Sequence, residues 1–195
     1  MSEEQSLAIS IEAAAAKIEN ELGLPTNFLW NLRHDDDWSV IIKLHALIET
    51  AVTHLLVRYF GHDELEDVFS NMELGNVRAG KVVFLSKLNC LEESQRGFIR
   101  RLSELRNQLV HDIRNVRFSL TEHVTKLSSE RYEAFLRDHA IDKEKAPSRA
   151  WVQENSKQVF LVTGIICLSS IYLEKELAMT KQEIIQKILA GFELK

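Results

Sequence analysis

The chain of 195 residues contains little cysteine, proline or glycine: two Cys, two Pro and seven Gly. So few turn-forming residues exclude a turn-rich sheet fold, a collagen-like chain and a disordered chain rich in Pro and Gly. The two cysteines, Cys90 and Cys167, provide neither a disulfide framework nor metal-ligand spacing, which indicates a reducing compartment. The first residues lack the basic and apolar regions of a secretory signal. We therefore expect a cytoplasmic protein.

Long hydrophobic runs are also scarce. The uncharged stretch from Gln158 to Leu173 spans 16 residues, fewer than the roughly 18 expected of a membrane-spanning helix. Thr163, Ser169 and Ser170 make this stretch more polar still. We expect it to form a buried core helix or a subunit-interface helix, and we expect no membrane partner.

Helical periodicity is present along nearly the whole chain. Apolar residues at three- and four-residue steps, with residues that start and stop helices, predict an all-α fold without strands. Capping boxes at Ser119/Glu122 and Thr180/Glu183 predict two of the helix starts. The expected helices cover residues 3–22, about 38–60, 63–72, 81–88, 92–116, 119–139, a long helix with Trp151 and the apolar run, and 184–189.

The length suits one globular domain with extensions. Residues 1–37 would supply an N-terminal helix and an acidic loop, and residues 38–140 a helical core. Residues 141–195 would supply a polar linker and C-terminal helices that pack on the core or at a dimer interface.

The predicted helix over residues 92–116 has two faces. At about 100° per residue, an apolar stripe about 80° wide contains Phe98, Leu102, Leu105, Leu109, Ile113 and Val116. The far side, about 100° wide, carries Arg100, Ser103, Glu104, Asn107, His111 and Arg114. Arg106 lies at the border between the two faces. We therefore expect His111 at the surface, one helical turn after Asn107.

Arginine is concentrated in this region of an acidic chain whose net charge is −5. Between Arg96 and Arg117, six arginines accompany only Glu104 and Asp112, which gives a local charge of +4. Guanidinium groups suit phosphate recognition, so one interpretation is a polyanion site. The other is a solvated helix face that pairs with acidic neighbours.

Common catalytic motifs are missing, including the nucleophile elbow, the phosphate-binding loops and the zinc-binding H-E-x-x-H. His34 and the three aspartates that follow it could hold a divalent ion, but a helix N-cap explains them more simply. His45 and Glu49 read as an ordinary i, i+4 helical pair. We expect neither a metal nor a cofactor.

The segment from Arg106 to His111 resembles the R-x(4–6)-H motif of the HEPN superfamily, and Asn107 is a polar residue favoured at that position. The helical segments before the motif, with Glu49 in the middle of the earlier one, are also similar, so the resemblance covers about residues 38–117. The order of the helices and the apolar C-terminal helix resemble the mannitol-operon-repressor branch. The members of that branch that we considered do not keep the Arg/His pair, whereas this chain does.

The resemblance implies a metal-independent endoribonuclease, a toxin or defence enzyme, that leaves 2′,3′-cyclic phosphate ends. His111 would act as general base or acid, Arg106 would hold the phosphate, and Asn107 would orient His111 or the substrate. Arg100, Arg101 and Arg114 would guide the RNA, and Glu49 would be an accessory residue. A homodimer would supply a second Arg106 and His111, and an antitoxin or regulatory protein is a further expected partner.

Two other interpretations remain. The chain can be a non-catalytic regulator that uses the same arginine face to bind a protein or a nucleic acid. It can also be a structural helical module in which Arg106 pairs with a carboxylate such as Glu49. An Arg106 that opens into a cleft favours catalysis, whereas a buried ion pair of Arg106 and a covered His111 favour the structural module.

Overall fold

The computed structural model describes residues 13–193, and within this range the chain is helical and contains no strand. The predicted all-α class with a long C-terminal helix is confirmed. After a helix over residues 13–21, the elements are α2 (Phe28–Asn31), η1 (Leu32–His34), α3 (Asp37–Phe60), η2 (Asp63–Leu65), α4 (Glu66–Ser70), α5 (Lys81–Lys87), α6 (Glu93–Val110), η3 (Ile113–Arg117), α7 (Leu120–Thr125), α8 (Ser129–Asp138), α9 (Arg149–Glu154) and α10 (Ser156–Glu193).

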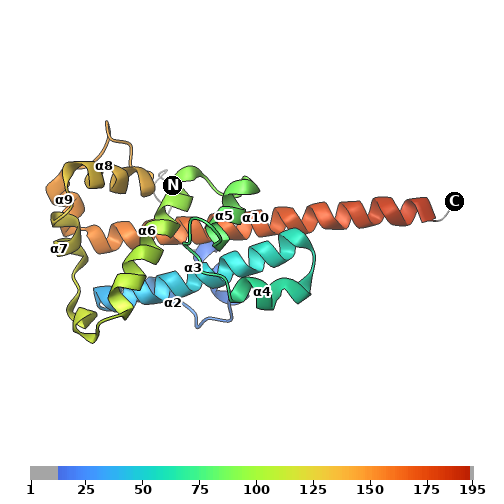
Figure 1. Cartoon of the computed structure of the whole chain (residues 1–195), viewed down its shortest axis with the longest axis horizontal. Helices are drawn as coiled ribbons and strands as arrows, with labels where there is room; N and C mark the ends of the chain where they lie inside the picture. The colour runs from blue at the N-terminus through green and yellow to red at the C-terminus, as the bar shows by residue number, and fades with distance from the viewer. Residues whose placement is uncertain (1–12, 194–195) are drawn as a thin grey trace.

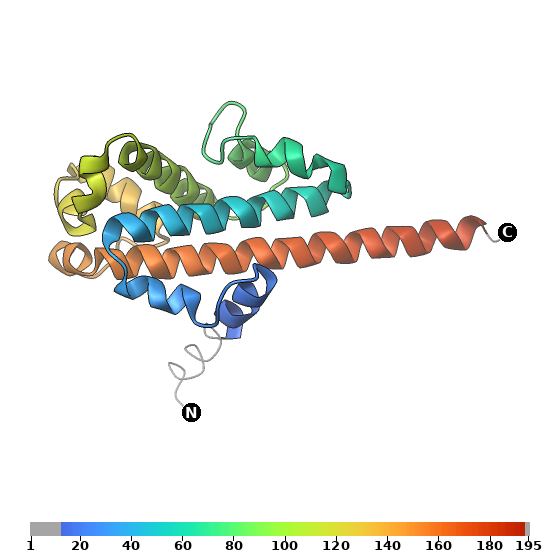
Figure 2. The ribbon, with the colours of Figure 1, turned by 90° about the horizontal axis from the view of Figure 1, so that it is seen from below.

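Helices α3 and α10 lie side by side along the length of the molecule (Figure 1). Seen from below, α6 lies on the far side of α3, while residues 13–34 cover the opposite side of α10 (Figure 2). A Cβ atom added to Gly164 would lie 2.6 Å from Cδ1 of Leu44, so glycine at this position permits the close approach of α3 and α10. The C-terminal part of α10 continues beyond the other helices.

One hydrophobic core joins the three predicted segments of the chain. It includes Ile18 and Leu29 from the first segment, the apolar face of α3, and Phe160 and Leu168 from α10. Apolar residues at three- and four-residue steps along α3 form its buried face: Ile41, Leu44, Ile48, Val52 and Leu55 each have 0% exposure. The packing of α3 against α10 and against residues 13–34 on the other side of α10 forms the support on which α6 lies.

The acidic cluster before α3 serves the fold. Asp36 is the N-cap of α3, and its carboxylate accepts the backbone N–H of Ser39 at 2.9 Å. The carboxylate of Asp37 accepts the backbone N–H of Leu120 at 2.8 Å and lies 3.0 Å from Nζ of Lys157. Gly61, with φ of 71°, ends the helix in the left-handed region. The helix N-cap predicted for the acidic cluster is confirmed.

The predicted helix over 92–116 is wrong at its C-terminal end, because α6 ends at Val110. Asp112 has an extended backbone, and its carboxylate accepts the N–H of Arg114 at 2.9 Å, so it starts the short 3₁₀ helix η3. As a result Ile113 and Val116, expected in the buried stripe, are 82% and 50% exposed.

Three further helix boundaries differ from the prediction. Trp151 and the apolar run lie in two helices, α9 and α10, because the chain leaves the helical conformation at Asn155. Residues 119–139 form α7 and α8 instead of one helix, because Ser128 caps a new start through the N–H of Arg131. The predicted start at Thr180 is wrong as well, since α10 is continuous there. The Thr180 hydroxyl donates to the carbonyl of Glu176 at 3.0 Å, which is compatible with an uninterrupted helix.

Helices α3 and α10 are both long and apolar enough to cross a membrane by length and composition. In α3, 67% of the most apolar window is buried within the protein, as in the core helix of a globular domain. In α10, half of that window is buried within the protein.

Candidate functional site: a polar cavity between α3 and α6

An open cavity of about 210 Å³ lies between α3, α6 and the loop that precedes α5. It contains one end of the Arg-His motif and the predicted accessory carboxylate. The residues that line it are His45, Glu49, Glu73, Leu74, Gly75, Asn76, Ser103, Glu104, Arg106 and Asn107. The fold therefore brings Arg106, Asn107 and Glu49 together.

On the wall formed by α3, the half-buried carboxylate of Glu49 joins a cluster with two buried side chains, His45 of α3 and Lys81 of α5. The ammonium of Lys81, whose side chain is only 1% exposed, lies 3.4 Å from Oε1 of Glu49. Nδ1 of His45 lies 3.7 Å from Oε2 of the same carboxylate. Glu49 thus stands between a cation and an imidazole, one helical turn after His45.

This environment changes the pKa of two groups in the cluster. Burial lowers the pKa of His45, the carboxylate of Glu49 opposes that shift, and the positive charges of Arg106 and Lys81 add to it. Burial also lowers the pKa of Lys81, again opposed by Glu49. His45 is therefore a neutral imidazole at pH 7, which can accept a proton.

The loop over residues 73–80 forms the second wall and is held in a fixed shape. Oδ1 of Asn76 accepts the backbone N–H groups of Arg78 and Ala79, at 2.9 and 3.1 Å. A Cβ atom on Gly75 would lie 2.5 Å from Cβ of Ser103, so the loop can approach α6 this closely only with glycine there. The cavity thus has one wall that depends on a specific loop sequence.

Helix α6 forms the third wall with two residues of the motif. Arg106 is half-buried, and its Nη1 donates to Oδ1 of Asn107 at 3.0 Å. Within residues 13–193, no carboxylate forms an ion pair with Arg106, and the carboxylate of Glu49 contacts Lys81 instead. The guanidinium therefore faces the cavity without an opposite charge in contact.

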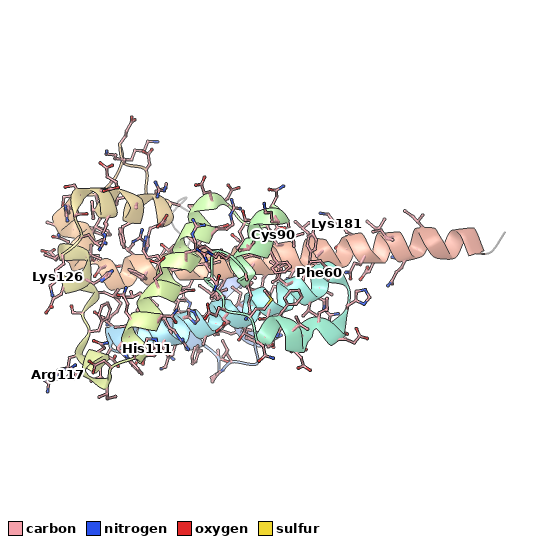
Figure 3. All side chains as sticks on the ribbon, in the orientation of Figure 1. Phe60, Cys90, His111, Arg117, Lys126 and Lys181 are labelled. Atoms are coloured by element: carbon pink, nitrogen blue, oxygen red, sulfur yellow. The ribbon has the colours of Figure 1, made fainter. Side chains whose placement is uncertain are left out.

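His111 lies outside this lining. It is the exposed C-cap residue of α6, one turn after Asn107 on the same face, and in the described part of the chain its ring forms no hydrogen bond (Figure 3). The expectation of a surface histidine is confirmed. The structure brings Arg106 and Asn107 into one cavity and places His111 beyond its edge.

The other arginines predicted to guide RNA have different surroundings. Arg101 donates through Nε and Nη2 to Oδ2 of Asp138, at 3.1 and 2.6 Å, and ties α6 to α8. Arg114 pairs with the neighbouring Asp112 at 2.6 Å on the surface. Arg100 is half-exposed, and no carboxylate pairs with it among the described residues. Of these three, Arg100 alone retains an uncompensated charge.

The sequence interpretation missed several parts of the cavity. Lys81 received no role, because nothing in the sequence predicts that a lysine at the start of α5 is buried against Glu49. The sequence predicts only an ordinary helical pair for His45 and Glu49, whereas in the structure both residues line the cavity. The only signal in the sequence was charge on a buried helix, since Glu49 lies among the apolar residues of α3.

Comparison with known proteins adds no assignment: no protein-family model, no curated protein and no solved structure matches this chain. Among the residues that the structure describes, no group of three or more His, Cys, Asp or Glu side chains is placed to hold a metal ion.

The contact of the buried Lys81 with the half-buried Glu49 predicts an effect on stability. Glu49→Gln leaves the ammonium of Lys81 buried without its partner, so we expect the free energy of unfolding to fall by about 2–3 kcal/mol. The double variant Lys81→Met/Glu49→Gln removes both charges and should recover most of that loss. Urea unfolding measures both effects.

The exposed pair of Lys43 and Asp35, 2.8 Å apart, provides the control. Lys43→Met should change the free energy of unfolding by less than about 1 kcal/mol, because surface pairs contribute little. A loss for Glu49→Gln no larger than this control would show that Lys81 does not depend on Glu49.

Proposed function

We propose that the protein is a metal-independent endoribonuclease that cleaves RNA through attack of the neighbouring 2′-OH on phosphorus, as the resemblance to the HEPN superfamily implies. The observation that supports it most directly is the position of Arg106, whose guanidinium lines an open polar cavity without a carboxylate partner. The exposed His111 stands one turn beyond Asn107 on the same helix.

The size of the cavity fits one phosphodiester group, and Arg106 is the positive group in its lining. Its volume of about 210 Å³ is below the roughly 300–1,000 Å³ of pockets that enclose whole small-molecule ligands. A planar guanidinium can hold two phosphate oxygens and stabilise the charge that develops in the transition state. Lys81 supports this role as a positioning residue, because it engages Glu49 and so leaves Arg106 available.

The reaction also requires one group that accepts a proton from the 2′-OH and one that donates a proton to the departing 5′ oxygen. His111 is one candidate, with Asn107 as the residue that orients it or the substrate. The resemblance implies a second His111 from a partner subunit. The cavity contains another candidate within the same chain, because His45 is neutral and close enough to Arg106 for the guanidinium to lower its pKa.

The test is RNA cleavage by the purified protein in excess EDTA, with analysis of the product ends. We expect 2′,3′-cyclic phosphate and 5′-hydroxyl ends, and no cleavage where a 2′-deoxynucleotide replaces the attacking ribose. Arg106→Ala, purified in parallel, should lose about 10²- to 10³-fold of the rate, because one charged stabilising group is removed. Arg131→Ala, which changes an exposed arginine on α8, should retain full activity and serves as the control for copurifying nucleases.

A non-catalytic regulator is the second candidate, and a specific observation favours it. Glu73 and Glu104 line the cavity beside Glu49, and their carboxylates oppose the approach of a phosphate. If this candidate is right, wild type and Arg106→Ala will both leave RNA intact in the assay above.

A further inference from the structure

The surface of α10 carries a regular row of exposed apolar side chains. Six residues, between 42% and 62% exposed, form what we call the α10 seam: Val162, Ile166, Leu173, Leu177, Ile184 and Ile188. They lie within an arc of about 80° and extend over about 39 Å of the helix axis at the standard rise per residue. No other exposed apolar row of this length occurs in the part of the chain that the structure describes.

The seam has a strict period of 11 residues. Val162, Leu173 and Ile184 form one row, and Ile166, Leu177 and Ile188 form a second row with the same spacing. Eleven residues correspond to three helical turns with a drift of only about 20°, so the seam stays on one side of a nearly straight helix. This period is typical of helices that pair along their length with little or slightly right-handed supercoiling.

The seam residues stay exposed within the described chain, although Val162 at the N-terminal end of the seam borders a cavity that Trp30 and Arg33 also line. Gly164, where α3 packs on α10, lies about 160° around the helix from the centre of the seam. The row continues past Gln182, whose side chain donates to the backbone carbonyl of Arg58, and α10 then extends beyond the other helices (Figures 1 and 3). A helical segment that projects alone is marginal in water, because most helix stability in proteins comes from packing of an apolar face.

We propose that the α10 seam is the interface of a homodimer in which α10 of one chain pairs with α10 of a second copy. An identical helix presents the same 11-residue period, so the side chains can interdigitate along the whole seam. The charges of this part of α10 are compatible with such pairing. Residues 173–188 contain three glutamates and three lysines, so two copies of the helix meet without net repulsion although each chain has a net charge of −5.

The area is sufficient for such a dimer. Six apolar side chains about half exposed contribute on the order of 500 Å² per chain, and the stems of the flanking Glu and Lys residues raise the total for two chains to roughly 1,200 Å², the lower end of specific interfaces. No residue of α10 lines the polar cavity, so this interface leaves the cavity open. The proposal does not depend on the ribonuclease activity.

Light scattering after size exclusion, over a range of protein concentrations, tests the proposal on the full chain. We expect wild type to have twice the 22.4 kDa mass of one chain. Leu177→Glu/Ile184→Glu places carboxylates in the seam and should weaken association at least about a hundredfold, which leaves a monomer. Val162→Glu/Ile166→Glu, at the other end of the seam, should act in the same way. Val68→Glu, at a 55% exposed apolar residue of α4, is the matched control and should remain dimeric.

Circular dichroism separates loss of pairing from loss of folding, since the seam residues are outside the core and the variants should keep the helical spectrum of the wild type. A wild type that is monomeric at every concentration would overturn the proposal. So would a dimer that persists in both seam variants. Monomers that bind phosphatidylcholine vesicles through the seam would show that a lipid surface, and not a second copy, covers it.

Discussion

His111→Ala should lower the rate of RNA cleavage by about 10²- to 10⁴-fold, which is the usual contribution of a general acid or base. The loss should appear in the catalytic rate with little change in RNA affinity, because the imidazole transfers a proton and the arginines carry the attraction for phosphate. Single-turnover kinetics with a short RNA substrate measures both quantities.

The exposure of His111 makes this result easy to interpret. A surface residue without a hydrogen-bond partner among the described residues should change the free energy of unfolding by no more than about 0.5 kcal/mol when it is replaced. His62→Ala, at an exposed histidine beyond the opposite end of α3, is the control and should cleave RNA like the wild type. Full activity of His111→Ala would assign the proton transfer to another group, and His45→Ala would then be the variant to measure.

His139→Phe should remove a large part of the sensitivity of this fold to acid. The imidazole is 6% exposed and lies among three phenylalanines, with its ring centroid 3.9 Å from that of Phe135. Nδ1 donates to the backbone carbonyl of Phe135 at 2.8 Å, and Nε2 is buried without a hydrogen-bond partner. Burial lowers the pKa of His139 to about 3, and the nearby Arg101 adds to the shift.

The direction of the pH effect follows from the difference between the pKa values of His139 in the folded and unfolded states. An unfolded histidine takes up a proton below pH 6.5, whereas the folded protein keeps His139 neutral down to about pH 3. The unfolded state therefore binds more protons in this window, and the free energy of unfolding falls by about 1.4 kcal/mol per pH unit as the pH drops. Above pH 6.5 this contribution is constant.

Urea unfolding at pH 7.5 and pH 5.0 measures the effect. His139→Phe should be within about 1 kcal/mol of the wild type at pH 7.5, because it loses one hydrogen bond but also the unpaired nitrogen. Between pH 7.5 and pH 5.0, the free energy of unfolding of the variant relative to that of the wild type should rise by about 2 kcal/mol. His45, His54 and His123, whose pKa values are also lowered by burial, are present in both proteins and cancel in the difference. Parallel pH profiles would show that His139 is accessible to protons in the folded state.

Much of the fold follows from local patterns in the sequence. The spacing of apolar residues at three- and four-residue steps in α3 and α6 predicts which side of each helix is buried. Asp36 and Gly61 mark the two ends of α3. These features depend on neighbours within about four residues, so one sequence contains them completely. The same reasoning places His111 on the surface, one turn after Asn107.

Where the sequence prediction was wrong, competing local interactions decided the outcome. The apolar spacing of Ile113 and Val116 continues the stripe of α6, but the carboxylate of Asp112 binds the N–H of Arg114 and starts a different helix. At Thr180 the opposite occurred, because a capping pattern lies inside a helix that is already continuous and the hydroxyl bonds to a carbonyl of that helix. A local sequence pattern defines which hydrogen bonds a side chain can form, and the surrounding structure determines which of them it forms.

The sequence by itself determined the all-α class, the long C-terminal helix and the exposure of His111. Only the tertiary structure decided that Glu49 faces Lys81, that Arg106 therefore lacks a carboxylate partner, and that the seam of α10 is uncovered. The physical reason is the separation along the chain of the residues that interact. Helix periodicity and capping act between residues close in the sequence, whereas Lys81 and Glu49 are 32 residues apart and meet only when α3 and α5 pack together. Charge pairing and burial between distant helices depend on that packing, and no local pattern specifies it.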